Sequence, residues 1–224
     1  MSGVVIAETL RRHYTSVAFV AYTIVLVMAA LFIGQFERPG SVWPGLVTLL
    51  AILAGCAPIG PEFSSGTLQL ILVKPITRSV YLLSRVAGVV LFIWIAASLA
   101  ALTEWIARGF SEGTPIAMVL VHSMAAALLV VSLLTLLGSF TRAYFNVALY
   151  FGLMIFLGLL IPVSARKLPE QVTRGLQAMS QNLFPDAPSR FTTDWLLLVT
   201  CNAVLALVLA CLIFRRREVP YGAE

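Results

Sequence analysis

Six apolar runs of 18–25 residues, separated by charged segments, limit what this chain can fold into. A bilayer core about 30 Å thick is crossed by roughly 20 apolar residues in a helix. The chain is 60% hydrophobic and 11% charged, whereas soluble domains carry about 45–50% apolar and about 25% charged residues. A soluble enzyme is therefore excluded. The sequence predicts an all-α, polytopic membrane protein with six transmembrane helices, at Thr15–Phe36, Val42–Ile59, Val86–Ala107, Ile116–Phe140, Ala143–Leu160 and Trp195–Phe214.

Positive charge decides the orientation that we expect. With six spans both termini lie on one side, which carries nine cations and four acids, while the other side carries six of each. Lys and Arg are enriched in cytoplasmic loops. Both termini are therefore expected in the cytoplasm, and the protein in the plasma membrane, the inner membrane of a bacterium. The net charge of +5 is scattered along the chain, which fits anionic lipid headgroups and not nucleic acid.

The chain divides into three predicted parts. Residues 1–14 form an interfacial helix, residues 15–214 the six-helix domain and residues 215–224 a cytoplasmic tail. The first apolar run is too long for a signal peptide, and no small-x-small cleavage site follows it, so we expect it to stay. Two loops matter: a cytoplasmic loop at 62–85 and an external loop at 166–194.

The N-terminal segment has the pattern of an amphipathic helix. Its apolar residues recur every three or four positions, at Gly3, Ile6, Ala7, Leu10 and Tyr14. Glu8 and Arg12 lie on the opposite face as an i,i+4 pair in the favourable order. Such a helix lies in the membrane interface with its apolar face at the acyl boundary. It is either a simple anchor or a rigid lever that joins a cytoplasmic partner to the first span.

The cytoplasmic loop 62–85 predicts a second, shorter helix. Adjacent serines can cap its start, Pro75 ends it, and Thr77 can cap the helix that runs into the third span. Apolar residues cover most of its circumference, at Leu68, Leu70, Ile71 and Leu72. That surface must be buried against the bilayer or a cytoplasmic protein. Lys74 and Arg78 suit acidic groups or lipid phosphate at this interface.

The same loop resembles a known family. The run Glu62-x3-Gly66-Thr67-Leu68-x5-Lys74-Pro75-Ile76-Thr77-Arg78 is similar to the loop after the second span in permeases of ABC type-2 transporters. The resemblance extends to six spans, inside termini, an amphipathic N-terminal helix and a larger external segment, so it covers nearly the whole chain. In that family the loop forms a coupling helix that docks into a cleft of the ATP-binding subunit. The resemblance therefore implies an ATPase-docking segment made of Glu62, Gly66, Thr67, Leu68, Leu70, Ile71, Lys74, Pro75 and Arg78.

ATP hydrolysis is not expected in this chain itself. The phosphate-binding sequence Gly-x4-Gly-Lys-(Ser/Thr) is missing, and neither of the two lysines follows a glycine. We therefore expect no cofactor here and ATP-Mg in a separate ABC ATP-binding subunit. The resemblance also implies a second permease chain, identical or homologous, which completes a twelve-helix pore domain.

The external loop 166–194 carries a further amphipathic pattern. Apolar residues at spacings of 4, 3 and 4 predict a helix that Pro185 ends, at Val172, Leu176, Met179 and Leu183. This helix either lies on the outer leaflet or forms a lid or docking surface for an extracytoplasmic protein.

Ionisable residues are scarce within the spans. Glu104 pairs with Arg108 near the outer end of the third span, and His122 lies about two turns into the fourth. A contact between Glu104 and His122 would permit a proton relay, whereas interfacial snorkelling and local pairing account for both residues without one. Tryptophans at the span ends are expected to be interface anchors, namely Trp43, Trp105 and Trp195.

No catalytic or metal site is predicted. The three cysteines lie inside apolar runs, without the spacing of a metal site. The chain has two histidines in all and one carboxylate within the predicted spans. These do not make the convergent set of side chains that intramembrane catalysis needs. The midplane acids and repeated halves of ion-coupled carriers are missing as well.

The sequence thus predicts the permease subunit of an ATP-driven ABC type-2 transporter. An uncharged path through the spans suits export of an apolar or amphipathic cargo. One alternative is a mechanotransmitter or assembly subunit, which passes ATP-driven conformational change to an extracytoplasmic partner at 166–194 without transporting a solute. Another is a stand-alone structural membrane protein.

Overall fold

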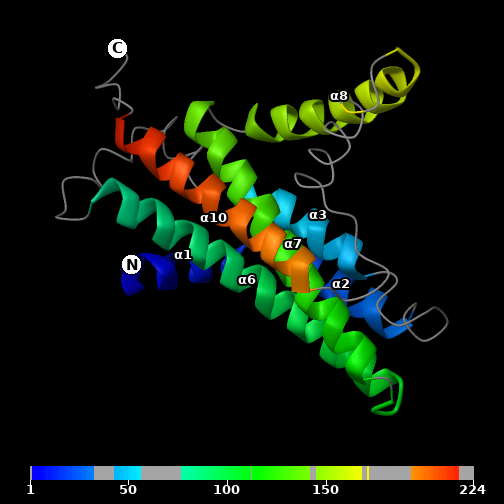
Figure 1. The fold of residues 1–224 in the computed structure, drawn as a ribbon. Helices are drawn as coiled ribbons and strands as arrows, with labels where there is room; N and C mark the ends of the chain where they lie inside the picture. The colour runs from blue at the N-terminus through cyan, green and yellow to red at the C-terminus, as the bar shows by residue number, and fades with distance from the viewer. Residues whose placement is uncertain are drawn as a thin grey trace.

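The computed structural model describes residues 2–32, 43–56, 77–111, 113–141, 145–167, 171 and 193–216. Every element in these ranges is an α-helix, and the helices form one elongated bundle with α8 projecting from it (Figure 1). The all-α prediction is confirmed for this part of the chain. The elements are α1 (Gly3–Thr15), α2 (Val17–Phe32), α3 (Trp43–Gly55), α6 (Arg78–Ala107), α7 (Gly113–Phe140), α8 (Phe145–Lys167) and α10 (Thr193–Arg216).

Membrane-spanning character rests on the long apolar helices. Within the described ranges three helices, α6, α7 and α10, are long and apolar enough to cross a membrane. The pair α1 and α2 passes the same test jointly but is bent by 74°, so the number is four if this pair is one span. The helix α3 and the stretch Phe145–Phe156 are shorter apolar helices. The protein is therefore of the helical membrane type, and the six-span arrangement stays a prediction.

Two helices extend beyond the predicted apolar runs. The helix α6 begins at Arg78 and not at Val86, because Thr77 caps it by accepting a hydrogen bond from the Val80 N–H at 3.4 Å. Helical hydrogen bonding continues through charged residues that a hydropathy window leaves out. Likewise α8 continues past the predicted end at Leu160 as far as Lys167. The predicted coupling helix and the predicted external helix at 172–183 lie outside the described residues.

The helices α6 and α7 form the centre of the bundle. The helix α6 packs against α1, α2, α3 and α10 as well as α7. Its buried face carries small residues that let neighbouring helices approach closely, among them Ala96, Ala97 and Ala100. A Cβ at Gly55 of α3 would lie only 3.1 Å from Leu134 Cδ1 of α7. Small side chains and glycine thus set how tightly the bundle closes.

The helices α7 and α10 lie side by side and run in the same direction (Figure 1). Ala125 and Leu129 of α7 form one buried cluster with Val199 and Ala203 of α10. The two residues from each helix are four positions apart, so the helices keep a common register. Both helices end at the same end of the bundle (Figure 1).

The helix α8 is joined to the bundle at its start. Asn146 is 2% exposed, and its Nδ2 donates to the backbone oxygens of Cys56 and Leu134, each at 3.2 Å. These bonds connect α8 to the end of α3 and to α7. Figure 1 shows the rest of α8 extending away from the other helices.

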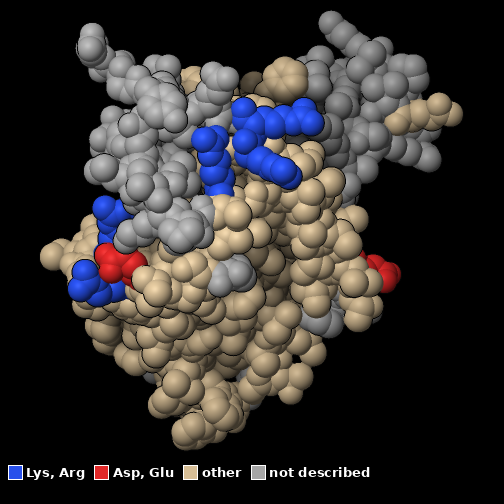
Figure 2. All heavy atoms as spheres, turned by 90° about the vertical axis from the view of Figure 1, so that its left-hand side faces the viewer, with Lys and Arg blue, Asp and Glu red and all other residues tan. Residues whose placement is uncertain are grey.

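Basic side chains gather at one end of the molecule. Figure 1 shows α1, the start of α6 and the end of α10 at the same end. These segments carry Arg11, Arg12, Arg78, Arg215 and Arg216. Figure 2 shows the Lys and Arg side chains on this face, above a large tan surface without charge. These arginines thus lie at one end of the bundle, the end that the charge pattern predicts to be cytoplasmic; we call it the basic face.

Candidate functional site

Of the nine predicted docking residues, the structure describes one. Arg78 is the first residue of α6 and is partly buried. The other eight lie outside the described residues, at Glu62, Gly66, Thr67, Leu68, Leu70, Ile71, Lys74 and Pro75. The described part of the site is therefore the start of α6, which follows the loop directly, and the helix that packs against it.

That helix is α1, and two polar contacts hold it to α6, while a third, within α6, orients the arginine that makes one of them. The Ser2 backbone N–H donates to Ser84 Oγ at 2.8 Å. Arg85 Nη1 donates to Thr9 Oγ1 at 3.2 Å, and Arg85 Nε donates to Tyr81 Oη at 3.1 Å. Thr9 is 1% exposed and Arg85 8%. A hydrogen bond made by a charged donor away from water is stronger than a neutral one, so these contacts tie α1 to the first turns of α6.

Close backbone packing adds to these contacts at Gly88. A Cβ at this position would lie 2.6 Å from Thr9 Cβ and 3.2 Å from the backbone oxygen of Ile6. Only glycine leaves room for α1 to approach α6 this closely. The face that α1 presents to α6 is thus made of Ser2, Ile6 and Thr9.

An aromatic cluster continues the contact where α1 meets α2. The His13 ring lies 4.9 Å from that of Phe19 and 5.1 Å from that of Phe92, centroid to centroid. Tyr14 meets Phe92 edge-on at 5.3 Å. The His13 pKa is lowered from its usual 6.5, first by burial and then by the nearby positive charges of Arg85 and Arg12, while the Thr9 backbone oxygen opposes this. Neutral His13 therefore joins α1, α2 and α6; we name this contact region, with Thr9, Arg85 and Gly88, the α1–α6 junction.

Sequence reasoning missed this junction. It predicted an apolar stripe on α1 and an ion pair between Glu8 and Arg12. In the structure Glu8 pairs with Arg11 at 3.2 Å, and the residues buried on α1 are Thr9 and His13. The available signals were a lone arginine followed three positions later by glycine in α6, and a polar pair at i,i+4 in α1. Neither signal predicts which residue of the other helix it contacts.

A second polar site lies at the opposite end of α6. Glu104 is 0% exposed; one carboxylate oxygen accepts from Trp43 Nε1 at 2.6 Å and the other from Arg108 Nε at 3.0 Å. The predicted pair of Glu104 with Arg108 is present, and it is buried. Trp43 is also 0% exposed and so is not the predicted interface anchor. The site fastens the start of α3 to the end of α6.

His122 has a different set of described contacts. Its Nδ1 lies 2.7 Å from the backbone oxygen of Met118, and its ring stacks on Trp195 of α10 with centroids 4.6 Å apart. The hydrogen bonds described above join Glu104 to an indole and a guanidinium. Among the described residues, no group of three or more His, Cys, Asp or Glu could hold a metal ion.

Comparison with known proteins adds no family. Neither a protein-family model nor a curated protein matches the chain. The function is therefore inferred from the residues and contacts described above.

Proposed function

We propose that this chain is the membrane-spanning permease subunit of an ATP-driven transporter of the ABC type-2 class. The observation that carries the proposal is the α1–α6 junction. The loop that resembles a coupling segment leads directly into α6, whose start is bonded to α1 through Ser84 and Arg85. A force applied to the loop by a docked ATPase would therefore move α1 and α6 together, as the lever reading of α1 requires.

Six spans would require a crossing between α7 and α10, because these two helices run in the same direction. In the proposed arrangement α8, which Figure 1 shows extending away from the bundle, would lie along it in the membrane and provide this crossing. The bend of 74° between α1 and α2 suits an interfacial helix followed by a first span. With α2, α3, α6, α7, α8 and α10 as spans, the basic face becomes the cytoplasmic side, where the ATP-binding subunit would dock. This chain then hydrolyses no ATP itself.

The proposed cargo follows from the outer surface of the helices. Exposed apolar residues cover α2, α8 and α10, and the charged residues of these three helices lie at helix ends. A path between two copies of such a domain suits an apolar or amphipathic molecule moving outward. The second permease chain would come from an identical or homologous protein.

The first test is capture of the ATP-binding subunit. The chain is purified from its native membrane in mild detergent, and mass spectrometry identifies what accompanies it. A stoichiometric ATP-binding protein is expected. Leu70→Asp and Ile71→Asp should each abolish this association. Burial of a polar group without a hydrogen bond is unfavourable by roughly 2–7 kcal/mol, and burial of an unpaired charge is more unfavourable still.

Phe110→Asp is the matched control. Phe110 is 64% exposed, lies after the far end of α6 and has a φ of 63°, which Asp tolerates better than most residues. It adds the same charge on the opposite side from the proposed docking face. Association that survives both loop changes, or is lost equally with Phe110→Asp, would refute the docking assignment. Reconstituted ATP-dependent flux separates a transporter from a mechanotransmitter.

A further inference from the structure

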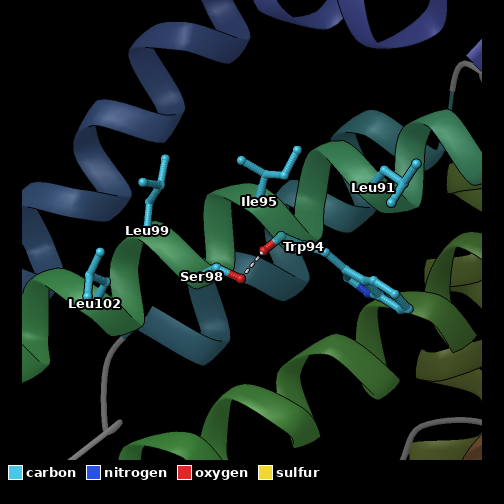
Figure 3. Close-up of a pocket in the computed structure, with 6 residues that line it drawn as sticks. All are labelled: Leu91, Trp94, Ile95, Ser98, Leu99 and Leu102. Atoms are coloured by element: carbon cyan, nitrogen blue, oxygen red, sulfur yellow. Dashed lines mark hydrogen bonds between the residues drawn. The ribbon is translucent and has the colours of Figure 1, made fainter. Parts of the chain in front are cut away.

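Two adjoining cavities form a groove on the side of α6 and α7. The first, of about 370 Å³, is lined by one face of α6 from Leu91 to Leu102 (Figure 3). The second, of about 520 Å³, shares Ser98 and Leu102 with it and continues between Trp105 of α6 and Gly113 of α7. We call this continuous hollow the α6–α7 groove. Its size is within the range of about 300–1,000 Å³ that is usual for ligand sites.

The walls of the groove are apolar along its length. Figure 3 shows Leu91, Ile95 and Leu99 pointing to the same side of α6. The opposite wall comes from Ile116, Ala117 and Leu120 of α7. Small residues, Ser98 and Ala101, form the floor and leave the hollow between the larger side chains. Such a surface takes up a long apolar group.

The polar groups along the groove are satisfied at one end and not at the other. Ser98 Oγ donates to the Trp94 backbone oxygen at 2.8 Å (Figure 3), and Trp94 Nε1 donates to the Met124 oxygen of α7 at 3.1 Å. Trp105 Nε1 is buried and has no hydrogen-bond partner among the residues that the structure describes. A buried donor without an acceptor is unfavourable. A ligand in the groove could therefore supply one hydrogen-bond acceptor, to Trp105 Nε1 at this end.

The length of the groove points to one leaflet of a bilayer. The part of the groove between Trp94 and Trp105 covers eleven positions of one helix, which corresponds to about 16 Å at about 1.5 Å per residue; from Leu91 the groove covers fourteen positions, or about 21 Å. Half of a hydrocarbon core about 30 Å thick is about 15 Å. Trp105 lies near the end of α6 opposite to the basic face, where an indole stands at the headgroup boundary. An acyl chain in the groove would thus bring its ester group to the level of Trp105.

We propose that the α6–α7 groove binds one acyl chain of a bilayer phospholipid, whose ester carbonyl accepts a hydrogen bond from Trp105 Nε1. A lipid supplies both features that the groove requires, a long apolar chain and one acceptor at its end. Gly113 is part of the site, because a Cβ there would lie 3.1 Å from Nε1 and crowd the N–H. The site belongs to this chain alone and does not depend on the proposed ATPase partner.

The test uses the full chain in phosphatidylcholine vesicles that contain a photoactivatable group on the acyl chain, without ATP or any partner. Labelled peptides are expected within residues 91–105 and 113–120, and at least one lipid per chain should survive purification in mild detergent. Ser98→Trp, from the floor, and Ala117→Trp, from the wall, should each reduce labelling of these peptides several-fold. Trp105→Phe keeps the ring and removes the donor, so the lipid should dissociate about fivefold faster, as expected for one hydrogen bond.

The matched control is Leu205→Trp. Leu205 is 57% exposed on α10 and does not line the groove, so labelling of residues 91–120 should not change. Labelling that is equal on α10 and in the groove, and that Ser98→Trp and Ala117→Trp leave unchanged, would overturn the proposal. So would conversion of a dimer to a monomer by both tryptophan variants, because a second copy of the chain would then cover the groove.

Discussion

The Arg85 guanidinium donates a hydrogen bond to the Thr9 hydroxyl at 3.2 Å, across 76 positions of the chain. Thr9 Oγ1 in turn donates to the Val5 backbone oxygen at 2.7 Å, so the hydroxyl is fixed on its own helix before it meets the arginine. Through this pair, a helix at the N-terminus and the segment after the proposed docking loop behave as one mechanical unit. The consequences can be measured at individual residues.

Thr9→Val tests the bond itself. Valine keeps the shape of threonine but offers Arg85 no acceptor, and hydrogen bonds to charged groups contribute about 1.5–3 kcal/mol. We expect the free energy of opening of α1, measured by amide hydrogen exchange over residues 3–15, to fall by about that amount. Thr15→Val is the control, since Thr15 bonds only to its own helix among its described contacts. Equal effects of the two changes would contradict the role given to Thr9.

Gly88→Ala tests the close approach of α1 and α6. The added Cβ would lie 2.6 Å from Thr9 Cβ, so α1 has to move outward. We expect faster exchange in α1 and, in the proposed transporter, ATP hydrolysis that no longer drives transport. Gly45→Ala on α3 is the matched change, because a Cβ there meets nothing within 4 Å, and it should leave both properties intact. An unaltered exchange rate with Gly88→Ala would show that the junction is loose.

The stability of the junction should depend on pH through His13. Its pKa in the fold is below the unfolded value of 6.5, chiefly because of burial. Above that value His13 is neutral in both states; as the pH falls below it, the unfolded state takes up a proton that the fold does not, and stability decreases. The opening free energy of α1 should therefore drop between about pH 7.5 and about pH 5.5.

His13→Phe keeps a ring between Phe19 and Phe92 and removes the titration. Its α1 stability should be flat over the same pH range, as followed by hydrogen exchange. A wild-type profile without slope, or the same slope in His13→Phe, would assign the pH dependence to another group.

Trp43→Phe tests the site at the far end of α6. The change removes the N–H that donates to the buried carboxylate of Glu104 at 2.6 Å. We expect a loss of about 1–3 kcal/mol in the free energy of unfolding in detergent. Glu104→Gln separates the two contacts, since the amide oxygen still accepts from the indole while the charge opposite Arg108 is gone. If Trp43→Phe unfolds like wild type, the bond does not fasten α3 to α6.

Asn146→Leu should loosen α8. It removes two hydrogen bonds and leaves the carbonyl groups of Cys56 and Leu134 without this donor. We expect a loss of about 1–3 kcal/mol that appears as faster exchange over residues 145–156. The neighbouring change Phe145→Leu, at a position 60% exposed, is the control. Protection that is equal in both variants would mean that α8 is held by other contacts.

The prediction of helices succeeded wherever hydropathy alone decides. Each of the six apolar runs overlaps a described helix, from α2 (Val17–Phe32) in the first run to α10 (Thr193–Arg216) in the last. That all six cross a membrane stays a prediction. The start of α6 was not predicted by hydropathy, because the cap at Thr77, and not the first apolar residue, determines where the helix begins. For the docking loop, sequence and resemblance remain the basis, since residues 57–76 lie outside the described chain.

The sequence by itself determined the all-helical, membrane type of the protein and the apolar segments that its helices contain. These follow from composition and order, because burial in a bilayer depends on runs of apolar residues and not on their partners. Only the tertiary structure decided that Thr9 meets Arg85, that Trp43 is buried on Glu104 and that Trp105 closes an apolar groove. Such pairings depend on how the surfaces of two helices fit together. The periodicity of a sequence shows which residues share a face of one helix, but not which helix that face contacts.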